Sequence, residues 1–146
     1  MQSPAIQLLL SALFMSTAWA QAPRKTEPCL HYDPSVVRLK GIITRKQFPG
    51  PPEYSDIKKG DAIEIFWILK TDHPFCVDQD NPKEDIDIPE SNINQVQLVV
   101  QNYNKYKSKK LIGKHVVVTG TLFHAITIHH RTKVLIMAQN IEPDTP

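Results

Sequence analysis

The sequence lacks the short motifs that mark the common enzyme classes. It contains no G-x-S-x-G, no H-E-x-x-H and no C-x-x-C, and its five glycines leave little room for a loop that cradles phosphate. The two cysteines also lack a reactive setting if they are bonded to each other. We therefore assign no catalytic residue; the sequence leaves the enzyme question open but favours a protein that is not an enzyme.

Charge is missing from the first twenty residues. An apolar run of about thirteen residues ends at the small-x-small triplet Ala18-Trp19-Ala20, which is typical of a secretory signal peptide cleaved after Ala20. The run is shorter than the roughly twenty residues that span a bilayer. No Lys or Arg precedes it, so an uncleaved anchor is the alternative. We expect an exported protein, periplasmic or secreted, with no transmembrane segment after cleavage.

The remaining chain has the length of one domain. We predict a signal peptide over 1–20, an N-terminal leader over 21–34, a single domain over 35–141 and a flexible tail over 142–146. The formal net charge is only +2, which argues against a dedicated nucleic-acid binder because such domains are strongly basic.

Only two cysteines are present, Cys29 and Cys76. Both follow the signal peptide, where export would permit oxidation, so we predict a disulfide. Closing this loop would contribute roughly 3–4 kcal/mol. Two buried free thiols, or half of a metal site completed by histidines, are the alternatives.

Alternation of apolar and polar residues predicts a mostly β protein. Gly41 and Gly120 interrupt two of the expected strands, where a bulge or bend is typical. On the second strand we expect Ile63, Ile65, Trp67 and Leu69 to face inward. The predicted strands are 35–46, 62–70, 95–101, 114–127 and 133–141, with a turn at 72–74, an exposed acidic loop over 78–94 and a short helix over 102–111.

The order β-β-β-α-β-β is that of a small OB-like five-stranded Greek-key barrel with one short helix. Bends at the two glycines suit long strands in a small closed barrel. A different small β-barrel or a β-sandwich is the alternative.

A further pattern is spread over most of the chain after the signal peptide. It consists of 34–37 through Gly41, 48–54, 59–61, 67–69, Cys76 with Val77, 111–114, 118–125 and His129-His130. These segments resemble the bacterial exported family called domain of unknown function 4431. The resemblance covers about residues 29–141 and implies a bacterial, periplasmic context, but no activity or site.

Three histidines gather late in the chain. His124 ends the fourth strand, and His129 and His130 lie in the following turn. Imidazoles brought together there could bind a divalent metal such as zinc. The alternative is that His124 packs locally and the other two are solvated; no other cofactor is expected.

A second candidate site is the outward face of the second strand. Phe66 and Ile68 would project there beside Glu64, close to Tyr54 in the proline-rich loop. OB-folds bind ligands on this face and on neighbouring loops, although the loop could instead bury Phe66. This face favours a non-enzymatic binding or accessory module that recognises a peptide, protein or glycan.

Two charged segments suggest weaker alternatives. Asp78 and Asp80 begin like a calcium loop, but Pro82, Lys83 and Pro89 occupy positions that the loop needs for ligands and glycine. Basic and aromatic residues over 103–114 resemble a single-stranded nucleic-acid surface; we expect a solvated helix face instead. Those residues are Tyr103, Lys105, Tyr106, Lys107, Lys109, Lys110 and Lys114.

Overall fold

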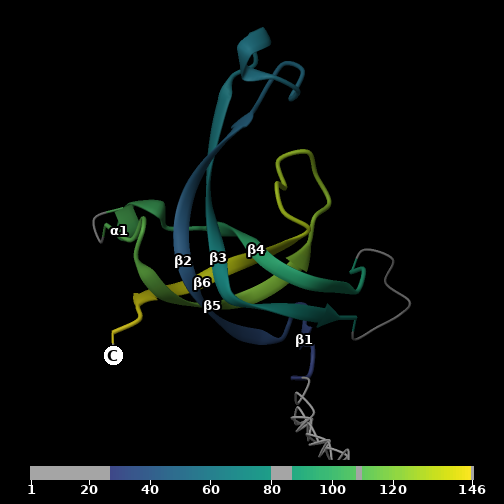
Figure 1. The fold of residues 1–146 in the computed structure, drawn as a ribbon, viewed down its shortest axis with the longest axis vertical. Helices are drawn as coiled ribbons and strands as arrows, with labels where there is room; N and C mark the ends of the chain where they lie inside the picture. The colour runs from purple at the N-terminus through teal and green to yellow at the C-terminus, as the bar shows by residue number, and fades with distance from the viewer. Residues whose placement is uncertain (1–26, 80–86, 108–109, 146) are drawn as a thin grey trace, which may run out of the picture.

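A computed structural model describes residues 27–79, 87–107 and 110–145. The predicted signal peptide, its cleavage after Ala20, the centre of the acidic loop and Lys109 lie outside these ranges. Five long strands form a closed barrel, with one short helix at its side (Figure 1). The elements are β1 (Leu30–His31), β2 (Val36–Pro49), η1 (Ile57–Lys59), β3 (Ile63–Asp78), β4 (Glu90–Val100), α1 (Tyr103–Lys107), β5 (His115–His124) and β6 (Val134–Pro143).

The barrel closes because the two strands at the ends of the sheet order, β3 and β4, also pair with each other. The order is β3-β2-β5-β6-β4, and β4 pairs again with β3. All pairings within this ring are antiparallel except β4 with β6, which are parallel. The prediction of a mostly β barrel with one short helix is confirmed. Among the described residues, no helix is both long and apolar enough to cross a membrane.

The predicted alternation of β2 is confirmed. Val37, Leu39 and Ile43 are buried, and intervening Arg38 and Lys40 are exposed. β5 contributes its own buried row to the same core, and the pairing of β5 with β6 shifts register at Gly120, which is a bulge as predicted. Local sequence therefore predicts β5 and the barrel part of β2 up to Ile43, because there each strand keeps one face against the core.

The predicted turn at 72–74 is wrong, because β3 runs on to Asp78. β4 also begins at Glu90, so the predicted acidic loop is shorter than 78–94. Beyond the expected turn, β3 still pairs with β4 at Phe75 and Val77, with two register shifts. Burial of the Val77 side chain stabilises this continuation of β3.

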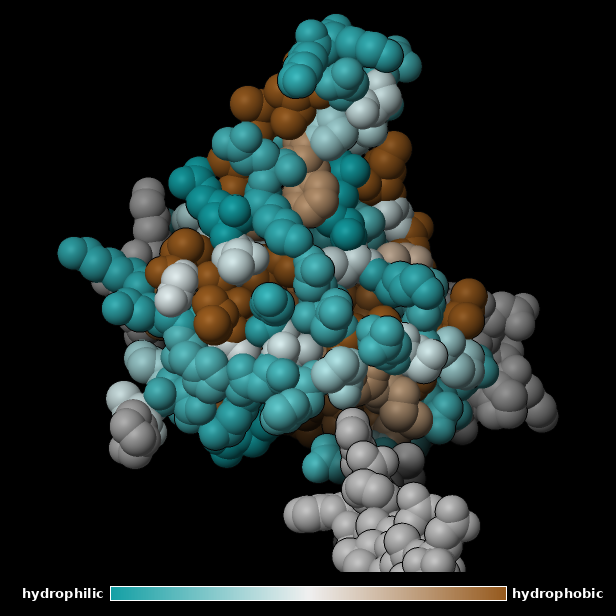
Figure 2. Space-filling model, in the orientation of Figure 1, coloured by the Kyte–Doolittle hydropathy of each residue, from teal (hydrophilic) through white to brown (hydrophobic). Residues whose placement is uncertain are grey.

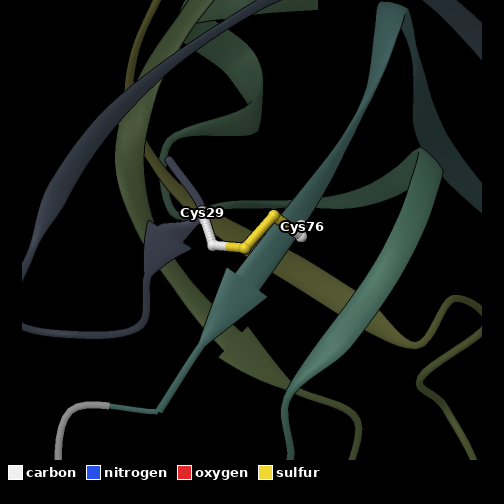
Figure 3. Close-up of a disulfide and its surroundings, with 2 residues drawn as sticks. All are labelled: Cys29 and Cys76. Carbon is white, nitrogen blue, oxygen red and sulfur yellow. A yellow bond between two sulfur atoms is a disulfide. The ribbon is translucent and has the colours of Figure 1, made fainter. Parts of the chain in front are cut away.

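The disulfide prediction is confirmed by geometry: the sulfurs of Cys29 and Cys76 lie at bonding distance, 1.98 Å (Figure 3). The bond fastens the described N-terminal segment to β3. β1 then pairs in parallel with the end of β3, Leu30 opposite Val77. Part of the predicted leader is thus a strand.

The inward assignment on β3 is only half right. Trp67 and Leu69 are buried, but Ile63 and Ile65 are 53% and 39% exposed. The reason is that β2 and β3 extend beyond the barrel as a projecting hairpin (Figure 1), and β4 pairs with β3 only from Ile68 onward. Figure 2 shows hydrophobic surface on this projection among largely hydrophilic side chains.

The helix and the C-terminal tail also differ from expectation. α1 covers five residues rather than 102–111. Tyr106 is buried and its hydroxyl donates to the carbonyl of Gln139 (3.3 Å), while Tyr103 packs on Trp67 with ring centroids 5.1 Å apart. β6 continues to Pro143. Of the two tyrosines, Tyr106 is therefore withdrawn from the surface, while Tyr103 remains 46% exposed.

Candidate functional site

The projecting hairpin meets the connection between β5 and β6 at one end of the barrel (Figure 1). Arg131, in that connection, joins the two. Its Nη2 donates to the carbonyl of Pro49 at the end of β2 (2.7 Å) and to Oε2 of Glu64 on β3 (3.0 Å). We call this meeting point, made by Phe48, Tyr54, Glu64, His129 and Arg131, the hairpin–loop junction.

Glu64 is the anionic centre of the junction. Its carboxylate also accepts a hydrogen bond from Nδ1 of His129 (3.1 Å). Burial acts to raise the pKa of Glu64, but the hydrogen bonds from Arg131 and His129 outweigh it and leave the pKa lowered. The His129 side chain is 52% exposed. Because its Nδ1 is held by Glu64, the ring has a fixed orientation at the surface.

Aromatic rings surround the side chains of Arg131 and His129. The Arg131 guanidinium lies over the rings of Phe48 (5.4 Å) and Tyr54 (5.9 Å). The Tyr54 and His129 rings meet edge-on, with their centroids 5.4 Å apart. The centroids of the Phe48 and Phe66 rings are 6.1 Å apart. Cation–π contacts of this kind stabilise the arrangement. The side chains of Phe48, Tyr54 and Phe66 are half-buried.

The tip of the hairpin is held by Asp61. Its carboxylate accepts hydrogen bonds from the backbone amides of Glu53 (2.9 Å), Ser55 (2.7 Å) and Asp56 (2.8 Å). These bonds, led by those from Asp56 and Glu53, lower the pKa of Asp61. They also bracket Tyr54, whose φ of 55° lies in the left-handed region. Asp61 therefore fixes the backbone that presents the Tyr54 ring.

A buried glutamine fixes the other side of the junction. Gln97 on β4 is 3% exposed; its Oε1 accepts from the Arg131 amide (2.6 Å) and its Nε2 donates to the His129 carbonyl (3.2 Å). Gln97 pairs with Ile68 across the sheet. The connection is thereby held down over the outer face of β3 and β4.

The predicted binding face is partly corrected. Glu64 and Tyr54 both join the junction through His129 and Arg131. Phe66 is half-buried and contacts Phe48 of β2 rather than the proline-rich loop that the alternative expected to cover it. Ile68 is fully buried and cannot be a surface contact. Its neighbour across the sheet, Gln97, is also buried and bonds the β5–β6 connection.

Arg131 and Gln97 were missed by sequence reasoning. Arg131 follows His129 and His130 directly, yet its partner Glu64 lies 67 residues away in sequence. Gln97 occupies an outward position on a strand, where a polar residue is ordinarily solvated. The only signal in the sequence was weak: Arg131 is an arginine in a short polar turn, His129-His130-Arg131-Thr132.

The three histidines proposed for metal do not converge. Nε2 of His124 faces Glu90 (3.3 Å) and Nδ1 of His129 bonds Glu64. Nδ1 of His130 accepts from the Ile126 amide (2.9 Å), and burial together with nearby His129 lowers its pKa. Across the described ranges, no group of three or more His, Cys, Asp or Glu is placed to hold a metal ion.

A second ionic cluster centres on Glu90 at the start of β4. Its carboxylate contacts Lys133 (2.9 Å) and His124 (3.3 Å). The hydrogen bond from Lys133 lowers the pKa of Glu90, and His124 lowers it further. Together they outweigh burial, which acts to raise this pKa. Nearby, burial and the charges of Glu90 and Asp87 raise the pKa of Tyr32 to about 12.

Acid should weaken the Glu90 cluster. A lowered folded-state pKa means that the carboxylate contributes stability above its ordinary pKa, 4.5, and that this contribution is lost as the pH falls through the folded-state pKa. Thermal melts between roughly pH 3 and 7 should show Glu90→Gln less stable than the wild type at neutral pH, with the difference closing in acid. Exposed Glu142→Gln should show little difference throughout. A constant difference for Glu90→Gln would contradict the assignment.

The chain thus carries a closed, disulfide-linked β-barrel with an aromatic and ionic junction at one end. Residues 95–142 match a family model described as Domain of unknown function (DUF4431). The resemblance inferred from the sequence is confirmed over this range, which runs from Gln95 in β4 to Glu142 in β6 and includes Gln97, His129 and Arg131. No curated protein matches this chain.

Proposed function

We propose that this protein is an exported, non-enzymatic binding module, periplasmic or secreted, which recognises a peptide, protein or glycan through the hairpin–loop junction. The observation that carries the proposal is the bonding of Arg131, in the β5–β6 connection, to Glu64 and Pro49 on the two strands of the hairpin. A connection locked to a hairpin by a charge-assisted bond forms a rigid surface, which reduces the entropy lost when a ligand binds.

The strand order supports an OB-like assignment for the barrel. Counted within the barrel, the strands run first-second-third-fifth-fourth around the ring, the third and fifth are parallel, and the helix lies between the third and fourth. OB-folds bind ligands on the second and third strands and on the loops after the first and fourth. Those two loops, residues 50–62 and 125–133, contribute Tyr54, His129 and Arg131 to the junction.

The exposed groups of the junction suit recognition rather than chemistry. His129 offers a ring nitrogen and Tyr54 a hydroxyl, beside the half-buried ring of Phe66. Aromatic side chains with polar tips are frequent anchors in binding sites. The disulfide favours an oxidising compartment and so supports export. A metal function has less support, because the three candidate histidines bond to different groups.

The test is a ligand screen followed by matched variants. Purified protein is screened against a glycan array and a displayed peptide library, and hits are measured by calorimetry. Tyr54→Ala should weaken the selected ligand about tenfold or more, the scale expected of a central aromatic contact. Ile65→Ala, on the opposite face of β3, serves as the control and should change affinity less than about twofold.

The fold of each variant is checked by its thermal melt. The proposal fails if Tyr54→Ala and Ile65→Ala have equal effects, or if His129→Ala and Tyr54→Ala both leave the affinity unchanged. It also fails if neither library yields a ligand that binds saturably.

A further inference from the structure

A groove of about 480 Å³ runs beside the junction, between the first half of β4 and the end of the β5–β6 connection. Arg131 belongs both to the groove and to the junction. A groove of this volume is within the usual range for small-molecule sites. Its lining residues are Ser91, Asn92, Ile93, Asn94, Gln95, Arg131, Thr132 and Lys133.

The lining is polar, and several of its side chains are not used in hydrogen bonds among the described residues. In the part of the chain that the structure describes, the side chains of Ser91, Asn92 and Asn94 make no hydrogen bond. Ile93, the one aliphatic residue of the lining, is buried in the barrel core. Hydroxyls and amides both donate and accept hydrogen bonds, as sugar hydroxyls do. Most ligand pockets are largely apolar, so this lining selects a ligand rich in hydroxyls.

The charge of the lining is positive. Arg131 and Lys133 contribute cations, and the lining contains no carboxylate. The Lys133 side chain is 70% exposed although its Nζ contacts Glu90. A third cation, Lys46, bonds the side chain of Gln95 at one wall. The Arg131 side chain is only 11% exposed and bonds Glu64, so it adds positive charge to the wall of the groove, whereas Lys133 is the accessible cation.

The backbone shapes the groove before any ligand arrives. The pairing of β4 with β3 shifts register on both sides of Phe75, opposite Ile93. Asn92 has a φ of 56°, in the left-handed region, which asparagine adopts more readily than most residues. Irregular backbone of this kind often occurs at binding sites.

From this combination we infer that the groove binds an acidic oligosaccharide. The side chains of Ser91, Asn92 and Asn94 bond ring hydroxyls, and Lys133 with Arg131 pairs a sugar carboxylate. Guanidinium and ammonium groups form strong charge-assisted hydrogen bonds with carboxylates. The inference rests on the proposed function and narrows its ligand from peptide, protein or glycan to one chemical class.

Three acidic oligosaccharides are titrated into the intact protein by calorimetry: tetragalacturonate, a hyaluronan hexasaccharide and sialyllactose. Maltotetraose is the neutral comparison. We expect at least one acidic probe to bind saturably below about 10 mM and maltotetraose to bind about tenfold more weakly. Asn94→Ala and Lys133→Gln should each weaken binding of the acidic probe about tenfold. Lys114→Gln, which changes an exposed lysine just before β5, should weaken it less than about twofold.

The inference is overturned if none of the three acidic probes binds, if maltotetraose binds equally well, or if Lys114→Gln weakens binding as much as Lys133→Gln. The two proposals fail separately. If Tyr54→Ala abolishes binding of a ligand and Asn94→Ala does not, the groove proposal is wrong and the junction proposal stands. If Asn94→Ala abolishes binding of an acidic sugar and Tyr54→Ala leaves it unchanged, the groove proposal stands and the junction proposal is wrong.

Discussion

Replacing Gly120 by alanine is expected to destabilise the barrel by at least about 4 kcal/mol, and the chain to fold poorly or not at all. A Cβ at this position would lie 2.1 Å from the carbonyl oxygen of Met137 and 2.9 Å from its carbonyl carbon. Both are backbone atoms of β6, so no side-chain rotation removes the overlap. β5 and β6 would have to separate at the bulge where they pair. Urea denaturation of the purified variant measures the loss.

Two controls separate this overlap from a general cost of losing glycine. At Gly60 a Cβ would meet no atom within 4 Å, although φ is 109°; Gly60→Ala should cost only the backbone strain, about 1–2 kcal/mol. Thr121→Ala, the next residue along β5, adds no atom and should cost less than about 1 kcal/mol. A Gly120→Ala variant no less stable than Gly60→Ala would contradict the close approach of β5 and β6. Gly41, whose Cβ would lie 2.1 Å from the Lys70 carbonyl oxygen, should behave like Gly120.

The second large effect is expected from loss of the disulfide. The bond spans a separation of 47 residues, and on the loop-entropy model its removal costs about 4 kcal/mol. The Cys29→Ser/Cys76→Ser double variant should therefore melt roughly 10–20 °C below the wild type. Differential scanning calorimetry at matched concentration measures this shift.

Reductant gives the internal comparison. Dithiothreitol should lower the melting temperature of the wild type toward that of the double variant and leave the double variant itself unchanged. If reductant changes neither protein and two thiols react in the native wild type, the cysteines are not bonded in solution.

The strands that the sequence predicts well are those whose neighbours are regular. β2 and β5 keep the same face against the core, so period-two alternation identifies Val37, Leu39 and Ile43 correctly. The cysteine pairing was predictable too, because the chain offers just two cysteines. These inferences depend on local pattern and composition alone.

The hairpin could not be read in the same way. Ile63 and Ile65 alternate as inward residues would, yet they lie where β3 has passed the end of its partner β4. Alternation records which side chains share a face; it does not record where the neighbouring strand ends. The burial of Ile68 was hidden for a similar reason, since its cross-strand neighbour Gln97 bonds the β5–β6 connection, which lies far away in sequence.

The junction was predictable only in part. Glu64 and Tyr54 were chosen from their places on a strand and in a loop, but their partner Arg131 is 67 residues from Glu64 in sequence. Which long-range cation reaches a given carboxylate depends on how the barrel closes. The histidines illustrate the reverse: closeness in sequence suggested a shared site, but strand and turn geometry directs His124 and His129 to different carboxylates.

The attachment of β1 also decides how the molecule can be presented. The disulfide and the pairing of Leu30 with Val77 fix the described N-terminal segment to one end of the barrel. The tip of the β2–β3 hairpin lies at the opposite end (Figure 1). A protein immobilised through its N-terminal side would therefore hold the hairpin–loop junction away from the support. Coupling through the hairpin lysines Lys58 and Lys59 would instead turn the junction toward the support and obstruct it.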